Sequence, residues 1–289
     1  MYILAVEMKR LTVIIVVLIL FDIALFSQEY NKLVEKSFEC IENEDWACAE
    51  ESLKNALKAE PANPQNSLLL SNLGTVQRYM GKNESAIKSY TNALMITPRS
   101  VTILKNRASL YASIDSLDKA ISDYSQVVAL DSKEHEAIYR RGLIYLQKHD
   151  TLYARYDFEY LMKQDSENRN GYIGFAALMK CRNYYAEAID IYSKVLKLNA
   201  NDYDAYFGRA EAYFYLGKML KAREDIKKAL ELNNTDPLVY ILRAKIEWSQ
   251  FERESAVNDF EKAVELGFSR EGVDKILSEL QVESKRRLR

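Results

Sequence analysis

The chain has 289 residues, of which 48% are hydrophobic and 28% are charged, and its formal net charge is −2. This balance is that of a globular protein and excludes a disordered or collagen-like chain. A net charge near zero gives no case for nucleic-acid binding, which would need a basic face, so we expect no nucleic-acid partner. Only 9 glycines and 4 prolines are present, too few for many strands joined by tight turns, which favours an all-helical fold.

The first 27 residues differ from the rest of the chain. Lys9 and Arg10 precede the apolar run LTVIIVVLIL at 11–20, and the small residue Ser27 follows it. A short basic region, an apolar run and a small residue are typical of a secretory signal peptide, so we predict cleavage before Gln28 and export, to the periplasm of a bacterium. A start at Met8 would give the usual Met-Lys-Arg opening.

An uncleaved anchor in the inner membrane is the alternative for this leader. A membrane-spanning helix needs about 20 apolar residues. Asp22 interrupts the apolar run, which favours cleavage. We therefore expect the membrane as a partner only if the leader is retained.

From Ser67 onward the chain divides into consecutive 34-residue repeats without a gap. An additional copy precedes them if Pro64, Gln65 and Asn66 are an insertion. Repeats 1 to 7 are then 30–63, 67–100, 101–134, 135–168, 169–202, 203–236 and 237–270. Position 20 is always alanine: Ala49, Ala86, Ala120, Ala154, Ala188, Ala222 and Ala256.

Two further positions keep their size in every repeat. Position 8 is small: Ser37, Gly74, Ala108, Gly142, Ala176, Ala210 and Ala244. Position 24 is large and apolar: Leu53, Tyr90, Tyr124, Phe158, Tyr192, Ile226 and Phe260. These sizes predict two helices per repeat that cross closely, with the side chain at position 24 filling the space before the next pair. One repeat cannot bury its apolar face alone, so the copies must stack.

The pattern resembles the tetratricopeptide repeat. Position 11 is tyrosine in Tyr111, Tyr145 and Tyr213, and position 32 is proline in Pro61 and Pro98, although later repeats lack this proline. The resemblance covers about 30–270 and implies an all-α fold, a right-handed α-solenoid of helix–turn–helix repeats. Residues 271–289 predict one more amphipathic helix that caps the last repeat, with a basic tail at Lys285, Arg286, Arg287 and Arg289.

Position 7 is arginine in four repeats, and position 23 of the same four repeats is aspartate. The pairs are Arg107 with Asp123, Arg141 with Asp157, Arg209 with Asp225, and Arg243 with Asp259. The other three repeats lack both residues. Because the two residue types occur together within a repeat, we predict a structural ion pair between its two helices, for which the planar fork of arginine is suited.

The sequence has no convergent group of reactive residues. It contains no glycine-rich phosphate loop and no Cys/His cluster with metal-ligand spacing, so we predict no enzyme, no catalytic residue, no metal and no cofactor. Cys40 and Cys48 lie at positions 11 and 19 of repeat 1, on its two predicted helices. They either form a disulfide, which export would permit, or serve as small core residues.

The resemblance implies that first helices line a concave groove, which usually holds peptides or protein segments at positions 2, 5, 6, 9, 12 and 13. Carried over to this chain, the groove candidates are Arg78, Tyr79, Lys105, Asn106, Tyr139, Arg140, Lys180, Phe207, Glu211, Phe214, Tyr215, Lys245 and Trp248. Aromatic rings and arginines are typical of binding hot spots. The alternative is that some of these rings pack on the neighbouring helix.

Together these patterns predict a non-enzymatic, exported interaction scaffold that binds a peptide or protein segment in its groove. The alternative is a membrane-anchored assembly factor with a retained N-terminal helix, whose repeats mediate self-association.

Overall fold

The computed structural model describes residues 28–287 of the chain, with side chains up to Val282. The predicted signal peptide, 1–27, and the side chains of the basic tail, Lys285, Arg286, Arg287 and Arg289, lie outside the described residues. Within 28–287 every regular element is an α-helix, which confirms the predicted all-α fold.

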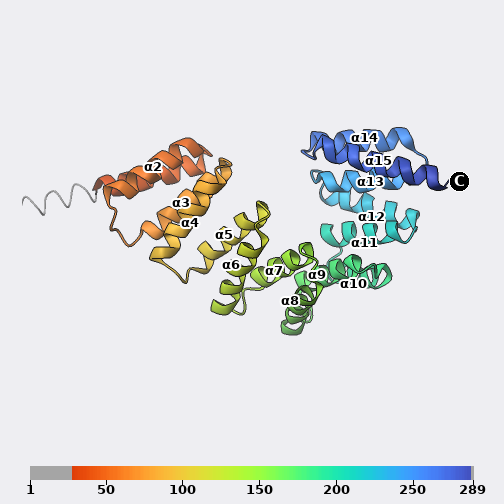
Figure 1. Ribbon diagram of the computed structural model, residues 1–289, viewed down its shortest axis with the longest axis horizontal. Helices are drawn as coiled ribbons and strands as arrows, with labels where there is room; N and C mark the ends of the chain where they lie inside the picture. The colour runs from red at the N-terminus through yellow and green to blue at the C-terminus, as the bar shows by residue number, and fades with distance from the viewer. Residues whose placement is uncertain (1–27, 288–289) are drawn as a thin grey trace, which may run out of the picture. The chain divides into compact units, whose positions relative to one another are not determined.

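The helices follow one another with short turns between them (Figure 1). The first runs through 28–42. The others are α2 (Trp46–Ala59), α3 (Asn66–Tyr79), α4 (Asn83–Ile96), α5 (Val101–Ser113), α6 (Leu117–Leu130), α7 (His135–Gln147), α8 (Thr151–Gln164), α9 (Arg169–Cys181), α10 (Tyr185–Leu198), α11 (Tyr203–Tyr215), α12 (Met219–Leu232), α13 (Pro237–Ser249), α14 (Arg253–Glu265) and α15 (Arg270–Arg287). From α4 to α14, each even-numbered helix begins 34 residues after the previous one.

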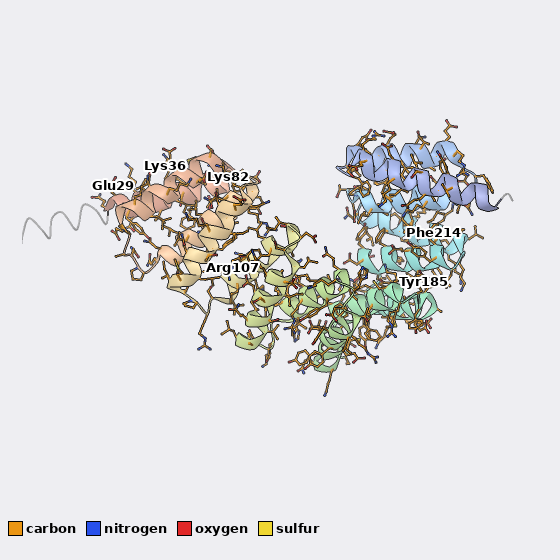
Figure 2. The ribbon with its side chains drawn as sticks, in the orientation of Figure 1. Glu29, Lys36, Lys82, Arg107, Tyr185 and Phe214 are labelled. Carbon is orange, nitrogen blue, oxygen red and sulfur yellow. A yellow bond between two sulfur atoms is a disulfide. The ribbon has the colours of Figure 1, made fainter. Side chains whose placement is uncertain are left out.

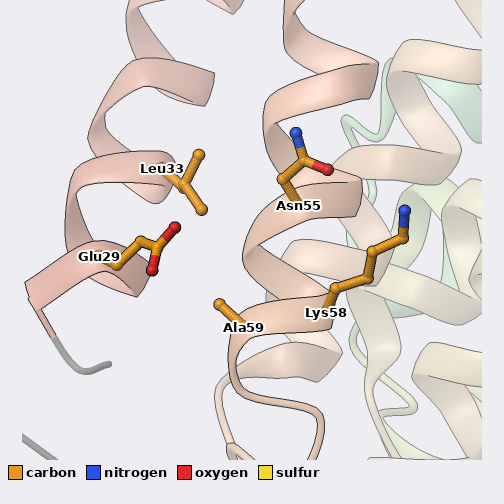
Figure 3. A pocket seen from close by; sticks show the side chains of 5 residues that line it. All are labelled: Glu29, Leu33, Asn55, Lys58 and Ala59. Carbon is orange, nitrogen blue, oxygen red and sulfur yellow. The ribbon is translucent and has the colours of Figure 1, made fainter. Parts of the chain in front are cut away.

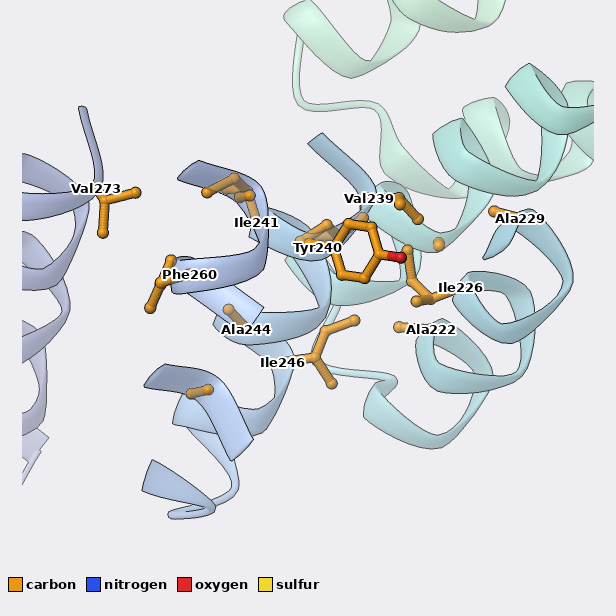
Figure 4. Close-up of a cluster of buried hydrophobic side chains, with 14 residues drawn as sticks. Ala222, Ile226, Ala229, Val239, Tyr240, Ile241, Ala244, Ile246, Phe260 and Val273 are labelled. Atoms are coloured by element: carbon orange, nitrogen blue, oxygen red, sulfur yellow. The ribbon is translucent and has the colours of Figure 1, made fainter. Parts of the chain in front are cut away.

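Helices pack in consecutive pairs, such as α3 with α4, α11 with α12 and α13 with α14. The chain forms two compact units, which meet between Ala137 and Ile138 within α7. In the first unit, one cluster of buried apolar residues joins the helix 28–42 to α2 and α3. In the second unit, one cluster extends from Leu146 of α7 to Ala212 of α11, and another, drawn in Figure 4, extends from α11 to Val273 of α15.

The small residues and the large residues of the repeat pattern meet in the core. All seven alanines at position 20 are 0% exposed, and all seven side chains at position 24 are buried. A Cβ atom added at Gly142 would lie 2.6 Å from Cε1 of Phe158, and one added at Gly174 would lie 2.2 Å from the same atom. The ring of Phe158 therefore lies between α7 of its own repeat and α9 of the next, as the sequence pattern predicts.

The turn between the two helices of each repeat has one residue in the left-handed region, always at position 15. These residues are Glu44, Gly81, Asp115, His149, Asn183, Gly217 and Phe251, with φ between 57° and 72°. Glycine adopts this conformation without a steric cost, but only Gly81 and Gly217 use it here. The fixed turn geometry explains why the period stays at 34 residues even where the turn residue is large.

The four Arg–Asp pairs join the two helices of their repeats through two hydrogen bonds each. In the pair between α7 and α8, Arg141 Nε donates to Asp157 Oδ2 at 2.9 Å and Arg141 Nη2 donates to Oδ1 at 2.6 Å. The same fork joins the pairs formed by Arg107, Arg209 and Arg243. The Asp157 side chain is only 1% exposed, so its charge depends on this partner.

Two of these arginines also bond the second helix of the preceding repeat. Arg107 Nη1 donates to Thr91 Oγ1 at 3.0 Å, and Arg209 Nη1 donates to Ser193 Oγ at 3.0 Å. Thr91 and Ser193 both occupy position 25 of their repeats. In these two repeats the arginine at position 7 therefore links three helices: its own helix, the second helix of its repeat and the second helix of the preceding repeat.

The repeats without this pair hold their helices in other ways. In repeat 1, Cys40 and Cys48 form a disulfide between the helix 28–42 and α2, with their Cα atoms 5.8 Å apart. In repeat 2, Ser89 Oγ of α4 donates to Gln77 Oε1 of α3 at 2.8 Å. In repeat 5, the apolar side chains Phe175 and Ile191 take the two positions and pack against the surrounding core cluster.

Glu50, a buried residue of α2, extends the repeat 2 network. Its Oε1 accepts from Gln77 Nε2 at 3.0 Å, and its two oxygens pair with Lys54 at 2.7 Å and Lys82 at 2.6 Å. Burial alone would raise the pKa of Glu50, but the hydrogen bonds from Lys54, Lys82 and Gln77 outweigh it and lower the pKa to about 2. The ionised form is therefore the one that stabilises this end of the chain.

We expect Asp157→Ala to lower the free energy of unfolding by about 3–5 kcal/mol, because it removes the buried carboxylate that accepts two hydrogen bonds from the guanidinium of Arg141. A double-mutant cycle with Arg141→Ala should give a coupling of at least about 1 kcal/mol by urea unfolding. The exposed pair Arg155–Glu159 on α8 is the control, with an expected coupling below about 1 kcal/mol. A coupling near zero at Arg141–Asp157 would refute the stabilising role of the pair.

We expect Glu50→Gln to lower stability near pH 7 by on the order of 1 kcal/mol, a modest value because both lysines are half-exposed to screening solvent. The folded pKa of Glu50, about 2, lies below its ordinary value of 4.5. Its contribution is thus complete above about pH 5 and is lost as the pH falls toward 2. Thermal unfolding from pH 7 to pH 3 should show the wild-type advantage shrinking. A constant difference, or an equal effect of the exposed neighbour variant Glu51→Gln, would contradict this assignment.

Candidate functional site

Eight side chains of the second compact unit line one pocket of about 160 Å³, here called the α11–α13 pocket. They are Phe207, Glu211, Phe214 and Tyr215 of α11 and Leu238, Ile241, Leu242 and Lys245 of α13. Five of them are groove candidates from the sequence: Phe207, Glu211, Phe214, Tyr215 and Lys245. The pocket is largely apolar and has one acidic and one basic side chain in its lining.

Helix periodicity explains how α11 and α13 present this surface. Phe207, Glu211 and Phe214 recur at intervals of four and three residues, so they share one face of α11. The start of each helix is fixed by an aspartate cap: Asp202 accepts from the backbone N–H of Ala205, and Asp236 accepts from that of Leu238. Both helices are first helices of their repeats, and they contact each other directly.

Stacked rings hold the aromatic wall of the pocket in place. The Tyr215 ring stacks on Tyr185 of α10 with centroids 5.1 Å apart, and Phe214 meets Tyr215 edge-on at 5.5 Å. Tyr203 stacks on Phe207 at 6.0 Å. Tyr185 and Phe214 are labelled in Figure 2. These contacts pre-organise the wall, so a bound group would need to order fewer side chains.

The acidic side chain of the pocket is already paired within the protein. Lys180 of α9 forms an ion pair with Glu211, and Lys180 Nζ lies 5.8 Å from the centroid of the Tyr192 ring. Burial lowers the pKa of Lys180, but Tyr192 and the Glu211 carboxylate outweigh it, so the pKa of Lys180 is raised. Lys180 therefore stays charged and neutralises Glu211. Within 28–287 no ion pair includes Lys245, whose charge is left for a ligand.

The groove candidates of the first compact unit lie on α3 and α5. Arg78 is exposed at the end of α3. Tyr79 is 67% exposed, and one face of its ring stacks on Trp46 of α2 at 4.6 Å. Lys105 forms an ion pair with Glu134 at 3.0 Å. Asn106 lies beside it on α5 and is half-buried.

Three groove candidates of the second unit lie elsewhere on its surface. Tyr139 of α7 packs against Phe158, with ring centroids 6.2 Å apart. Arg140 is exposed. Trp248 is half-buried, and its ring is covered by the guanidinium of Arg253, whose Cζ lies 3.7 Å from the ring centroid. The ring of Trp248 is thus engaged by its own chain on one face.

Sequence reasoning did not single out Leu238, Ile241 and Leu242, although they complete the pocket. They occupy positions 2, 5 and 6 of repeat 7, the same positions from which the candidates were chosen. Their positions in the repeat therefore predicted a place in the groove. The candidates, however, were chosen for a charged or polar group or an aromatic ring, so these aliphatic side chains were not included. Leu238 is 46% exposed and is the most accessible of the three.

A second hollow, of about 330 Å³, lies in the first compact unit (Figure 3). It is lined by Glu29 and Leu33 of the helix 28–42 and by Asn55, Lys58 and Ala59 of α2. It contains no ring and none of the groove candidates, so it lacks the apolar anchor site that the α11–α13 pocket provides.

In 28–287 no group of three or more His, Cys, Asp and Glu side chains could hold a metal ion. None of the helices in this range is both long enough and apolar enough to cross a membrane.

Comparisons with known proteins agree with the helical pairs. Two models of the tetratricopeptide repeat match the chain, one at residues 69–100 and the other at residues 183–246. The structure of a tetratricopeptide repeat protein from Parabacteroides merdae is 38% identical, with a TM-score of 0.81, over 88% of this chain and 99% of that chain. No curated protein matches the sequence.

More distant structures share the fold alone. A thermophilic tetratricopeptide repeat protein from Thermus thermophilus is 15% identical, with a TM-score of 0.58, over 63% of this chain and 100% of that chain. The protein pilF of Pseudomonas aeruginosa is 17% identical, with a TM-score of 0.54, over 74% of this chain and 97% of that chain.

Proposed function

Because the chain belongs to the tetratricopeptide repeat family, whose members are typically non-catalytic protein-interaction scaffolds, we propose that it holds a segment of a partner protein on the first helices of its second compact unit. The observation that carries this proposal is the α11–α13 pocket, which gathers five groove candidates from two consecutive first helices.

The size of the pocket favours a side chain over a small molecule as its occupant. Pockets that bury whole small molecules have volumes of about 300–1,000 Å³, whereas this one has about 160 Å³. Its lining of three rings and three aliphatic side chains suits one apolar anchor residue. Lys245 would face an acidic residue beside that anchor, while Glu211 is neutralised by Lys180. The proposed ligand is a segment with an apolar anchor next to a carboxylate.

We also propose that the protein is exported and works in the periplasm. The leader at 1–27 has the composition of a signal peptide. The disulfide between Cys40 and Cys48 is an independent support, because disulfides persist mainly in oxidising compartments. The alternative, a membrane-anchored assembly factor whose repeats mediate self-association, differs in retaining the leader.

Selection of a random peptide library on the intact chain tests the scaffold proposal. We expect the enriched peptides to share one apolar residue flanked by an acidic residue. Leu238→Asp should weaken their binding at least about tenfold, because it places a charge in the apolar pocket. The control Lys228→Asp, on the exposed face of α12, should leave binding unchanged. Enriched peptides that bind the Leu238→Asp variant as well as the wild type would place the binding surface elsewhere.

The mass and N-terminal sequence of the protein isolated from a bacterial host test the export proposal. We expect the mature chain to begin at Gln28 and to gain two daltons on reduction of its disulfide. An intact leader would favour the membrane-anchored alternative, and a mass that is unchanged by reductant would remove the support from Cys40 and Cys48.

A further inference from the structure

A larger pocket, of about 430 Å³, lies between α12 and α13 of the second compact unit. It is lined by Arg223, Ile226, Lys227, Leu230 and Glu231 of α12 and by Arg243 and Glu247 of α13. It shares no residue with the α11–α13 pocket. Its volume is within the range of about 300–1,000 Å³ that is usual for small-ligand sites.

One cause of this α12–α13 pocket is the residue at position 11 of repeat 7. In repeats 3 and 6 a tyrosine follows the position 7 arginine by four residues, on the same helix face. Its ring lies against the guanidinium: the Cζ atom of Arg107 is 5.8 Å from the Tyr111 centroid, and that of Arg209 is 5.9 Å from the Tyr213 centroid. In repeat 7 the corresponding residue is Glu247, so the ring at position 11 is replaced by a shorter carboxyl group. The ring at position 4 is kept: the Cζ atom of Arg243 lies 5.3 Å from the Tyr240 centroid, as that of Arg209 lies 5.7 Å from the Tyr206 centroid.

A second replacement faces the same arginine. Thr91 and Ser193, at position 25 of the preceding repeats, accept hydrogen bonds from the Nη1 atoms of Arg107 and Arg209. The residue that corresponds to them before Arg243 is Lys227. A lysine ammonium can donate hydrogen bonds but cannot accept them. Arg243 Nη1 therefore lacks the hydroxyl acceptor that its counterparts have, while Asp259 occupies its Nε and Nη2.

The carboxyl group of Glu247 is also incompletely satisfied. Its Oε2 is buried and has no hydrogen-bond partner among the described residues. Burial, together with the charges of Asp259 and Glu252, raises the pKa of Glu247 to about 7 against the opposing charges of Arg243 and Arg223. A buried acceptor without a donor is unusual in native structures, and it is satisfied when a ligand donates to it.

We propose that the α12–α13 pocket binds an aromatic ring that carries a hydroxyl group, such as the phenol of a tyrosine side chain. The ring would lie on the guanidinium of Arg243 above the apolar floor of Ile226 and Leu230. Its hydroxyl would accept from Arg243 Nη1 and donate to Glu247 Oε2, because a hydroxyl group can do both. The ligand thus supplies the second ring and the hydroxyl that the chain itself provides around the arginines of repeats 3 and 6.

The charges around the pocket favour an uncharged ligand. Arg243 is neutralised by Asp259, and Arg223 forms an ion pair with Glu252. The third basic side chain of the lining, Lys227, is accompanied there by the carboxyl groups of Glu231 and Glu247. A phosphate or carboxylate ligand would therefore meet guanidinium groups that are already paired, and it would lie beside Glu247. A phenol avoids this repulsion and satisfies both polar groups.

Titration of the intact chain with 4-methylphenol and with toluene, followed by NMR, tests this assignment. We expect 4-methylphenol to bind at least about tenfold more tightly, because only it offers a hydrogen bond to the buried carboxyl group. Glu247→Tyr places at position 11 the tyrosine that repeats 3 and 6 have. This variant should no longer bind 4-methylphenol, and its midpoint of urea unfolding should be higher than that of the wild type. The control Glu224→Gln changes an exposed carboxylate of α12 outside the pocket and should leave binding unchanged.

A second comparison identifies the source of the phenol. Binding of N-acetyl-tyrosinamide at least as tight as that of 4-methylphenol would indicate the tyrosine of a partner protein, and exclusion of the amide would indicate a free small phenol. Failure of 4-methylphenol to bind, equal binding of toluene, or undiminished binding to a folded Glu247→Tyr variant would each overturn the proposal.

Discussion

The close contact between small residues and one large side chain sets the spacing of every helix pair in this protein. The alanine at position 20 is fully buried in all seven repeats, and the small residue at position 8 leaves room for the side chain at position 24. Phe158 shows the geometry most clearly, because its ring occupies the space that a Cβ atom at either Gly142 or Gly174 would need. Larger residues there would force the helices apart, because protein cores do not accommodate added volume without strain. The same spacing brings α11 and α13 close enough for their side chains to form one pocket.

Polar contacts then specify which helices pair. The repeats in which these contacts are replaced by others indicate where a binding site could form. The Arg–Asp fork recurs in repeats 3, 4, 6 and 7, where it satisfies a buried carboxylate. A disulfide, a Gln–Ser hydrogen bond and an apolar pair take its place in repeats 1, 2 and 5. Repeat 7 keeps the fork and the ring of Tyr240 beside Arg243, but Glu247 replaces the tyrosine at position 11 and Lys227 replaces the hydroxyl residue at position 25 of the preceding repeat, and both line the α12–α13 pocket. Departures from a locally consistent pattern are where binding sites are expected.

The sequence was sufficient for the period, the helix pairs and the positions of the small residues, because these depend on spacing along a single chain. The joint occurrence of arginine and aspartate pointed to a contact within each repeat, and the structure has hydrogen bonds between these residues. Contacts between repeats were not predictable in the same way. The pairing of Lys180 with Glu211 and the stacking of Tyr215 on Tyr185 depend on which rotamers two helices allow where they meet. The aliphatic wall of the α11–α13 pocket was missed for a different reason, because Leu238, Ile241 and Leu242 look like ordinary core residues in a sequence.

The spacing of the paired helices depends on the tight approach at position 20, and two alanines of α10 test this dependence directly. Ala188 is 0% exposed at that position, whereas Ala186, two residues earlier on the same helix, is exposed. Urea unfolding of Ala188→Leu and Ala186→Leu compares the same change in size at both places. We predict a loss of about 1–3 kcal/mol or more for Ala188→Leu and a change within about 0.5 kcal/mol for Ala186→Leu. Equal stabilities of the two variants would contradict the claim that small residues at this position set the spacing of the helices.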